Sequence, residues 1–274
     1  MVSSGQIILQ SVSHREINMF TPIDTVVGSR FNSALSCNFL DAYMDFATKQ
    51  ILQDEVRQPS KTFAPSTIRC KRISWFRLRG VEPEPETNVD LGLNFTAQVG
   101  TACHQTIQTN LAQLLGDDWL DVEEYFKSAN LPYEYTCTNN GTETLVELTN
   151  PPMKFAPDGI LRYEGKVRLL EIKTSEYDSF NKLSAPKSHH MDQIKCYCTI
   201  LNLHDAIVIY QDRLYGDMKC FEVHVSDGEM NAIRNMFSEV QDCVKKNIAP
   251  PRLPKGDRWC TKAHCRYYGK CQEW

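Results

Sequence analysis

The chain has 274 residues, of which 42% are hydrophobic, so it is long enough to bury the core of one large domain. Its formal net charge of −4 excludes a uniformly basic nucleic-acid-binding protein but allows basic residues to be concentrated locally. We expect a cytoplasmic protein without a membrane segment, because the N-terminus lacks the features of a signal peptide and no apolar run has membrane-spanning length.

The first 65 residues carry the weakest pattern of the chain. Residues 38–56 predict a helix, because apolar side chains recur there at helical spacing. Residues 58–65 are rich in helix-breaking residues and are typical of a linker. We therefore predict an N-terminal extension over residues 1–65, whose pattern indicates no chemistry, and a main domain over residues 66–274.

A basic helix is predicted over residues 67–79, with Ser66 as its N-cap and Gly80 at its end. It is the most basic segment of the chain, and a solvated helix face is the plain interpretation of such a run of charge. Cys70 lies within this helix.

The longest helical pattern covers residues 91–115, where apolar side chains repeat every three to four positions. His104 lies beside this apolar stripe, and Gly100, one turn earlier, leaves room above its imidazole. A single histidine in such a place is usually a packed boundary residue. Metal ligation is the alternative, because a neutral imidazole is a common metal ligand.

Two β-hairpins are predicted after this helix. Residues 131–150 form the first, around an Asn-Asn-Gly-Thr turn. Residues 155–174 form the second, because Gly165 permits the positive φ of a tight turn between two strands.

Three charged side chains converge in the second hairpin. Pairing across its turn places Asp158 opposite residue 172, give or take one, and the two-residue repeat of a strand puts Glu171 and Lys173 on one face. Such a group among apolar neighbours is costly to bury unless it is used, and a divalent metal ion would use it. An exposed hairpin with a surface salt bridge is the alternative.

The remaining elements complete a mixed α/β pattern. A helix over residues 191–201 places Gln193 and Tyr197 on one face, as an incidental polar edge or as part of a site. Two strands and a closing helix are predicted over residues 206–210, 219–225 and 229–246.

Three cysteines near the end of the chain, Cys260, Cys265 and Cys271, lie in a segment with little apolar core, which indicates ligation rather than packing. A closed Zn²⁺ site or a cubane cluster needs four thiolates, so the fourth must come from elsewhere, and Cys70 is the candidate. His264 is a weaker alternative ligand. The other seven of the chain's 11 cysteines are interpreted as small core residues.

In this order the motifs resemble those of the PD-(D/E)XK nucleases. Pro157-Asp158 followed by Glu171-Ile-Lys173 is similar to the superfamily signature. Gly100-Thr-Ala-Cys-His104 and Gln193-x-x-x-Tyr197 are similar to motifs of its RecB-like branch. The four cysteines resemble those of the iron–sulfur members of that branch, such as the AddB nuclease domain and the CRISPR-associated RecB-like exonucleases. The tail spacing C-x4-C-x5-C departs from the usual C-x2-C-x5-C.

The resemblance implies an α/β fold with a restriction-endonuclease-like core, that is, a mixed β-sheet flanked by helices, with a helical N-terminal part and a cysteine-rich tail. It implies ligands for Mg²⁺ or Mn²⁺ on four residues: His104, Asp158, Glu171 and, through its carbonyl, Ile172. In the family the lysine, here Lys173, positions the attacking water. The glutamine and tyrosine, here Gln193 and Tyr197, orient the lysine and contact the DNA backbone.

The resemblance also implies a [4Fe–4S] cluster on Cys70, Cys260, Cys265 and Cys271, with Zn²⁺ as the alternative. We therefore expect a metal-dependent DNA exonuclease that acts on single-stranded ends in recombination, repair or replication, in a phage or prokaryotic host. The expected DNA contacts are Arg69, Arg72 and Arg77, as a charged entrance for a strand end.

A helicase, recombinase or integrase is the expected protein partner, and the sequence is compatible with an oligomer. The alternative function is a non-catalytic or accessory DNA-binding subunit of a recombination or adaptation complex.

Overall fold

The computed structural model describes residues 43–49, 60–84, 91–139, 141 and 143–274. The chain divides into two compact units, residues 1–46 and 47–274, and the second contains every element discussed below. Residues 43–49 are helical, and the rest of the helix predicted over residues 38–56 lies outside the described residues. None of the described helices is both long enough and apolar enough to cross a membrane.

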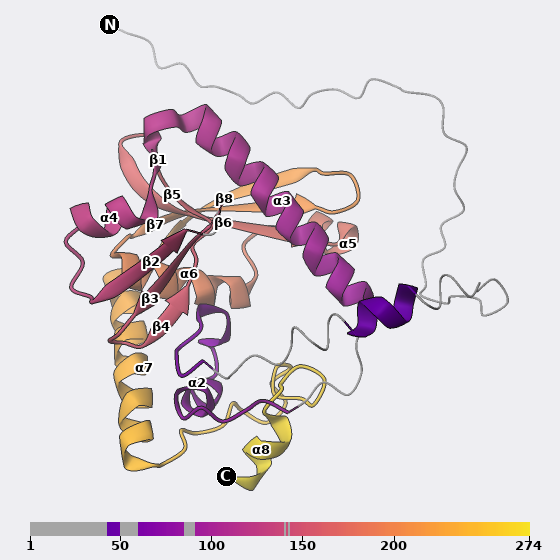
Figure 1. Ribbon diagram of the computed structural model, residues 1–274, viewed down its shortest axis with the longest axis vertical. Helices are drawn as coiled ribbons and strands as arrows, with labels where there is room; N and C mark the ends of the chain where they lie inside the picture. The colour runs from indigo at the N-terminus through magenta and orange to yellow at the C-terminus, as the bar shows by residue number, and fades with distance from the viewer. Residues whose placement is uncertain (1–42, 50–59, 85–90, 140, 142) are drawn as a thin grey trace, which may run out of the picture. The chain divides into compact units, whose positions relative to one another are not determined.

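A mixed five-stranded sheet forms the centre of the second unit (Figure 1). Its strand order is β1-β5-β6-β7-β8, with β6 and β7 parallel and the other neighbours antiparallel. The strands are β1 (Trp119–Leu120), β5 (Gly159–Tyr163), β6 (Lys166–Ser175), β7 (Asp205–Asp212) and β8 (Met218–His224). Helices flank this sheet, which confirms the predicted α/β architecture.

The first predicted hairpin belongs to a smaller antiparallel sheet, which consists of β2 (Tyr135–Asn139), β3 (Thr144–Leu148) and β4 (Met153–Phe155). Phe63 pairs with Met153 at the edge of this sheet and is fully buried. The packed core therefore begins slightly before Ser66, where the main domain was predicted to start.

The two faces of β6 meet different helices. Leu170 and Ile172 pack with Ile107 of helix α3 (Leu91–Leu115), which runs along the sheet in Figure 1. Leu169, with the opposite orientation, packs in the larger core that contains Ile194 of helix α6 (Ser188–Leu201). Because side chains alternate along a strand, Glu171 and Lys173 share the face that carries Leu169.

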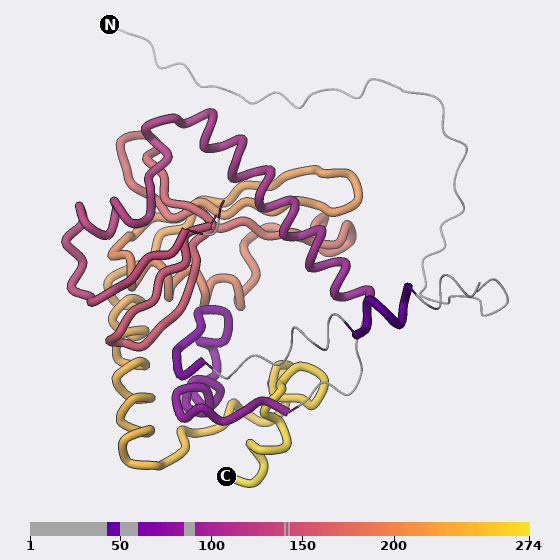
Figure 2. Tube along the Cα trace, viewed as in Figure 1, coloured from indigo at the N-terminus to yellow at the C-terminus, as the bar shows by residue number. Residues whose placement is uncertain are grey.

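Further helices surround this core, and the tube view in Figure 2 shows how the chain passes between them. They are α2 (Lys71–Leu78), α4 (Val122–Ser128), α5 (Tyr177–Asn181), α7 (Asp227–Lys246) and α8 (Tyr268–Glu273). Helix α7 packs on both α2 and α6. It begins at Asp227, two residues earlier than predicted, with a capping box in which Ser226 and Glu229 bond each other's backbone N–H.

The basic helix predicted from Ser66 begins later than expected. Pro65–Thr67 is a separate 3-10 turn, and helix α2 begins at Lys71 with Cys70 as its extended N-cap. The prediction missed this break because Ser66, the predicted N-cap of the helix, lies inside the 3-10 turn, whose N-cap is Ala64. Gly80, with φ of +66°, ends the helical segment as predicted. Cys70 consequently lies at a helix N-terminus instead of within a helix.

Candidate functional site

The β5–β6 hairpin has the predicted turn and register. Glu164 and Gly165 have φ of +50° and +76°, the two consecutive positive values of a tight hairpin turn. Gly159 pairs with Leu170, so Asp158 stands beside Glu171, within one residue of the predicted position. Its Oδ2 accepts a hydrogen bond of 2.6 Å from the backbone N–H of Ile172, which fixes the carboxylate against β6.

Gly159 is required for this arrangement because Trp119 covers it. A Cβ atom at this position would lie 2.6 Å from the indole ring, closer than real Cβ contacts come. Gln108 of α3 donates a bond of 2.8 Å to the carbonyl oxygen of Asp158. The backbone around Asp158 is thus held from the strand, from the indole and from the helix.

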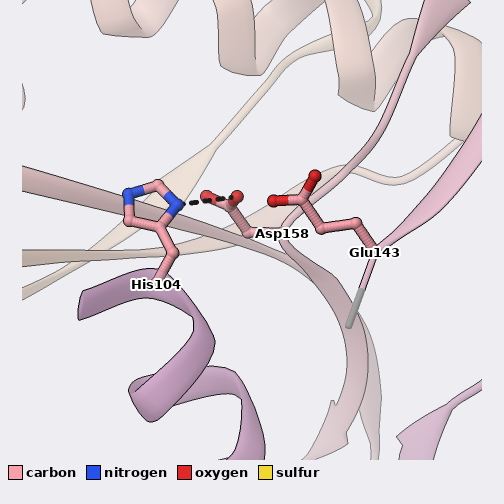
Figure 3. A group of neighbouring side chains, drawn as sticks. All are labelled: His104, Glu143 and Asp158. Carbon is pink, nitrogen blue, oxygen red and sulfur yellow. Dashed lines mark hydrogen bonds and ion pairs between the residues drawn. The ribbon is translucent and has the colours of Figure 1, made fainter. Parts of the chain in front are cut away.

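Three potential metal ligands converge at Asp158, as Figure 3 shows. His104 Nδ1 lies 3.2 Å from Asp158 Oδ1, and the ligand atoms of His104, Glu143 and Asp158 all lie within 4.8 Å of one another. His104 comes from α3 and Asp158 from the start of β5, while Glu143 directly precedes β3. A site with one imidazole and two carboxylates suits Mg²⁺ or Mn²⁺.

Glu143 was not among the residues predicted for the site. It directly follows the turn of the first hairpin. Its distance from Asp158 is not set by a fixed spacing in the sequence and depends on how the smaller sheet folds back over Asp158. The Gly-Thr-Glu sequence after the turn gives no signal of metal binding, so this candidate ligand is identified from the structure and not from the sequence.

Glu171 is a buried acid, 1% exposed, beside the converged ligands. Burial, followed by the negative charge of Asp158, raises the pKa of Glu171 to about 7, against the charge of Lys173. Its Oε1 forms an ion pair with the Lys173 ammonium, and its Oε2 has no hydrogen-bond partner among the described residues. One oxygen of this carboxylate therefore accepts no hydrogen bond from the described part of the chain, although the group is buried and an unpaired negative charge is costly there.

Lys173 continues into a polar chain on α6, formed by the two side chains that helical spacing placed on one face. Its Nζ donates to Gln193 Oε1 at 3.3 Å, and the Gln193 amide donates to the Tyr197 hydroxyl at 3.2 Å. That hydroxyl donates at 3.2 Å to the carbonyl of Ala156, two residues before Asp158. Tyr197 is buried, and burial raises its pKa well above the ordinary value. In this arrangement its hydroxyl is occupied by protein groups, which does not fit a direct DNA contact.

The arginines predicted to contact DNA have protein partners. The guanidinium of Arg72 is buried and donates to the Pro250 carbonyl at 2.8 Å and to the carbonyl and sulfur of Cys271. Arg77 donates to the Thr62 carbonyl and to the hydroxyl of Ser60. The DNA contacts predicted for these two side chains do not fit these positions, because a phosphate would have to displace their partners.

Arg69 lies partly exposed between two acidic side chains. Its guanidinium is 3.7 Å from Asp192 Oδ2 on α6 and 3.4 Å from Asp257 Oδ2 in the C-terminal tail. The charge predicted to meet DNA is thus already balanced within the protein.

The four cysteines predicted to act together line one cavity of about 220 Å³. Cys70 comes from the start of α2, Cys271 from α8, and Cys260 and Cys265 from the tail between α7 and α8. Burial raises the pKa of the Cys70 and Cys265 thiols, and the charges of the other cysteines add to this effect. His264 also lines the cavity, with its Nδ1 2.9 Å from the Thr261 hydroxyl oxygen.

The other cysteines are distributed as expected, with one exception. Cys196 and Cys198 are buried in the core, and Cys103, Cys137 and Cys243 are half-buried. Cys220 is exposed on β8, so it is not the core residue that was predicted. Cys37 lies outside the described residues.

No protein-family model matches the sequence, and no curated protein matches it. Among solved structures the chain is similar to a protein named SSO0001, with 18% identity and a TM-score of 0.44 over 86% of this chain and 98% of that one. It is also similar to LHK-Exo, an alkaline exonuclease from Laribacter hongkongensis, with 16% identity and a TM-score of 0.42 over 69% of this chain and 90% of that one. A structure of LHK-Exo in complex with dAMP gives 14% identity and a TM-score of 0.41. These TM-scores are too low to assign a fold by similarity. The description of the fold therefore rests on the strand order of this chain alone.

Proposed function

We propose that the chain is a divalent-metal-dependent DNA nuclease, most active as an exonuclease on single-stranded ends. The observation that carries this proposal is the convergence of His104, Glu143 and Asp158 within 4.8 Å, beside a buried acid–lysine pair. Phosphodiester hydrolysis needs both features, a place for a hard cation and a group that holds the attacking water.

The residues fit a Mg²⁺ or Mn²⁺ ion. The trio His104, Glu143 and Asp158 would hold it, and the unpartnered Oε2 of Glu171 would be a further oxygen ligand. The family resemblance adds the Ile172 carbonyl to this set. A buried carboxylate whose pKa is raised to about 7 gains most from a nearby cation, because the cation offsets both its desolvation and the repulsion from Asp158. The bound metal supplies Lewis-acid activation of the phosphodiester and of a bound water.

The protein's own contribution is to position Lys173. The ammonium is held between Glu171 and Gln193, which fixes its direction and leaves a donor for the attacking water. Gln193 is in turn oriented by Tyr197, which is anchored on the Ala156 carbonyl. Because Ala156 lies on the segment that carries Asp158, this chain of bonds keeps the lysine and the ligand in register.

We propose that the cysteine cavity holds a [4Fe–4S] cluster on Cys70, Cys260, Cys265 and Cys271. The buried guanidinium of Arg72 supports an anionic occupant, because in the described part of the chain its bonds go to carbonyls and a sulfur instead of to a carboxylate. A cluster bound by four thiolates would supply the missing negative charge. Its role would be structural, since phosphodiester hydrolysis transfers no electron.

Zinc is the alternative occupant, and the spacing of the sulfurs disfavours it. A tetrahedral site with Zn–S bonds of about 2.3 Å holds its sulfurs about 3.8 Å apart. Among the described residues, no trio of cysteine sulfurs converges within 4.8 Å as the ligands at Asp158 do. A cubane places its irons between the thiolates and so accommodates wider spacing.

The test is degradation of end-labelled single-stranded DNA with Mn²⁺ by protein purified without oxygen. We expect Lys173→Ala to lower the rate at least about 100-fold, with folding and metal content unchanged. Lys154→Ala is the matched control, because Lys154 pairs with Glu147 at the surface, and it should cut normally. A folded, metal-loaded wild type that cuts no better than Lys173→Ala would contradict the proposal and favour an accessory DNA-binding subunit.

A further inference from the structure

The first turns of helix α6 have contacts with both candidate sites. His189 lines the cysteine cavity, whereas Gln193, one turn later, accepts the hydrogen bond from Lys173. A helix is stiff over one turn because its backbone bonds link successive residues. A displacement of His189 would therefore move Gln193 as well.

An ionic bridge joins this part of α6 to the segments that carry the cysteines. Arg69 directly precedes Cys70 and pairs both with Asp192 of α6 and with Asp257 of the tail. Asp257 is itself tied to the tail, because its Oδ1 accepts the backbone N–H of Trp259 at 2.9 Å and its carbonyl accepts that of Cys260. The bridge thus links two cysteine segments to the residue adjacent to Gln193.

An aromatic contact forms a second, independent link. The rings of His189 and Trp259 lie 5.1 Å apart with an interplanar angle of 55°. Both residues line the cysteine cavity, and neither His189 Nδ1 nor Trp259 Nε1 has a hydrogen-bond partner among the described residues. Trp259 directly precedes Cys260, so the position of this indole depends on how the tail is held.

The link reaches the lysine through one hydrogen bond, which is long at 3.3 Å. Gln193 Oε1 shares the Lys173 ammonium with the closer Glu171, so a small outward shift of α6 would break its bond to the lysine. If α6 moved outward, Lys173 would pair with Glu171 alone. Glu171 would then bind a divalent cation less readily, because the ammonium would neutralise it more completely.

We propose that the occupied cysteine site positions the nuclease centre through Asp192 and His189, so that filling the cysteine site raises the affinity of the nuclease centre for its divalent cation. This inference rests on the proposed function, which supplies both sites. Asp192 and His189 are positioning residues, since they act on Lys173 through Gln193. Linkage requires the reverse effect as well, so the divalent cation should raise the affinity of the cysteines for their metal group by the same factor.

The test compares Mn²⁺ binding by protein with a filled cysteine site and by protein from which that metal group has been removed. Titration calorimetry, with iron content and circular dichroism as checks, should show binding at least about fivefold weaker after removal. A supporting kinetic readout is the rate at which air bleaches the cluster absorbance, which Mn²⁺ should slow if it steadies the same segments. In His189→Ala/Asp192→Asn, the filled and emptied proteins should bind Mn²⁺ equally, at the weaker level.

Lys71→Gln is the matched control. Lys71 follows Cys70 and pairs at 2.5 Å with Glu239 of α7, so its loss removes an ion pair of the same segment without touching α6. This variant should behave as the wild type does. If the double variant fails to fold, Arg69→Gln removes the bridge from its other end and should also weaken the coupling.

The possible results distinguish a failure of this inference from a failure of the proposed function on which it rests. Equal Mn²⁺ affinity of folded wild type with and without the metal group would overturn the positioning role while leaving both sites in place. Purified protein without metal on its cysteines, or filled protein that binds no Mn²⁺, would instead contradict the proposed function and with it this inference.

Discussion

In the described part of the chain, the two sites differ in the sign of the charge that they lack: the first lacks positive charge and the second lacks negative charge. At the proposed nuclease centre, the carboxylates of Asp158 and Glu171 are close together and largely buried, with Lys173 as the nearby cation. At the cysteine cavity, the buried charge is the cation of Arg72, which bonds to carbonyls and sulfur. The first site favours a small hard cation and the second favours an anionic group, so the same metal would not suit both.

The sites also differ in the structure that supports them. Glu171 belongs to β6 and Asp158 directly precedes β5, so the pairing of these two strands in the central sheet anchors the backbone of both residues. The tail that carries Cys260 and Cys265 consists largely of turns and bends. We infer that metal removal perturbs the nuclease centre mainly in charge and the cysteine region mainly in structure.

The largest expected effect is that of Cys70→Ser. It should abolish metal binding at the cysteines and lower the free energy of unfolding by about 3 kcal/mol or more, since a structural metal contributes directly to folding. The melting temperature should fall by about 6–12 °C. Thermal unfolding and iron content measure these changes, and Cys220→Ser, at an exposed thiol, should alter neither.

Glu143→Gln should have a smaller effect, confined to the other site. Loss of one carboxylate from the trio with His104 and Asp158 should weaken Mn²⁺ binding about 10–100-fold with unchanged iron content. The control is Glu147→Gln, which removes a surface acid of the same hairpin that pairs with Lys154. If the two variants bind Mn²⁺ equally well, Glu143 is not a ligand.

The charge at Glu171 should make the stability of the metal-free protein depend on pH. Its pKa is raised from 4.5 to about 7 in the folded state, so the folded protein holds a proton that the unfolded chain has lost between these values. This contribution is fully present below pH 4.5 and disappears as the pH rises through about 7, on the order of 1–3 kcal/mol in total. Urea unfolding at pH 5.5 and 8 should show the decline in wild type, and a Glu171→Gln variant that declined equally would refute its assignment to Glu171.

Glu229→Gln should have the smallest effect and alter both regions alike, because α7 packs on α2 and α6. The Ser226 backbone N–H and Lys195 lower the pKa of Glu229 to about 2, so its contribution is present above pH 4.5 and is lost as the pH falls toward 2. The side chain is partly exposed, and we expect a loss below about 1 kcal/mol at pH 7. Thermal unfolding at pH 7 and pH 3 measures it, and the difference between wild type and variant should be smaller at pH 3 than at pH 7.

The sequence predicted the local features of the nuclease centre because they depend on short-range rules. The turn at Gly165 and the two-residue repeat of a strand sufficed to place Asp158 beside Glu171 and Lys173. Helical spacing likewise put Gln193 and Tyr197 on one face. The grouping of Cys70 with the tail came from the number of thiolates that a closed site needs.

What the sequence did not reveal depends on packing between distant segments. Glu143 reaches the site because the small sheet folds over Asp158, and Arg72 became a buried structural cation because the tail covers it. A basic run is usually solvated, and nothing in the pattern of residues 67–79 shows which arginines the tail will cover. The break before Lys71 was missed for a local reason, since Ser66 is a good capping residue but lies inside a 3-10 turn here.

The contacts of Arg69 and Arg72 with the tail join residues 178 to 199 positions apart in the chain. At about 5–20 residues per second, the ribosome would make those partners roughly 10–40 s after the arginines. During that interval Cys70 has none of its companion thiols, and Arg72 lacks the carbonyls that later enclose it. The central sheet can assemble earlier in synthesis, whereas the cysteine cavity can close only after Cys271 has left the ribosome.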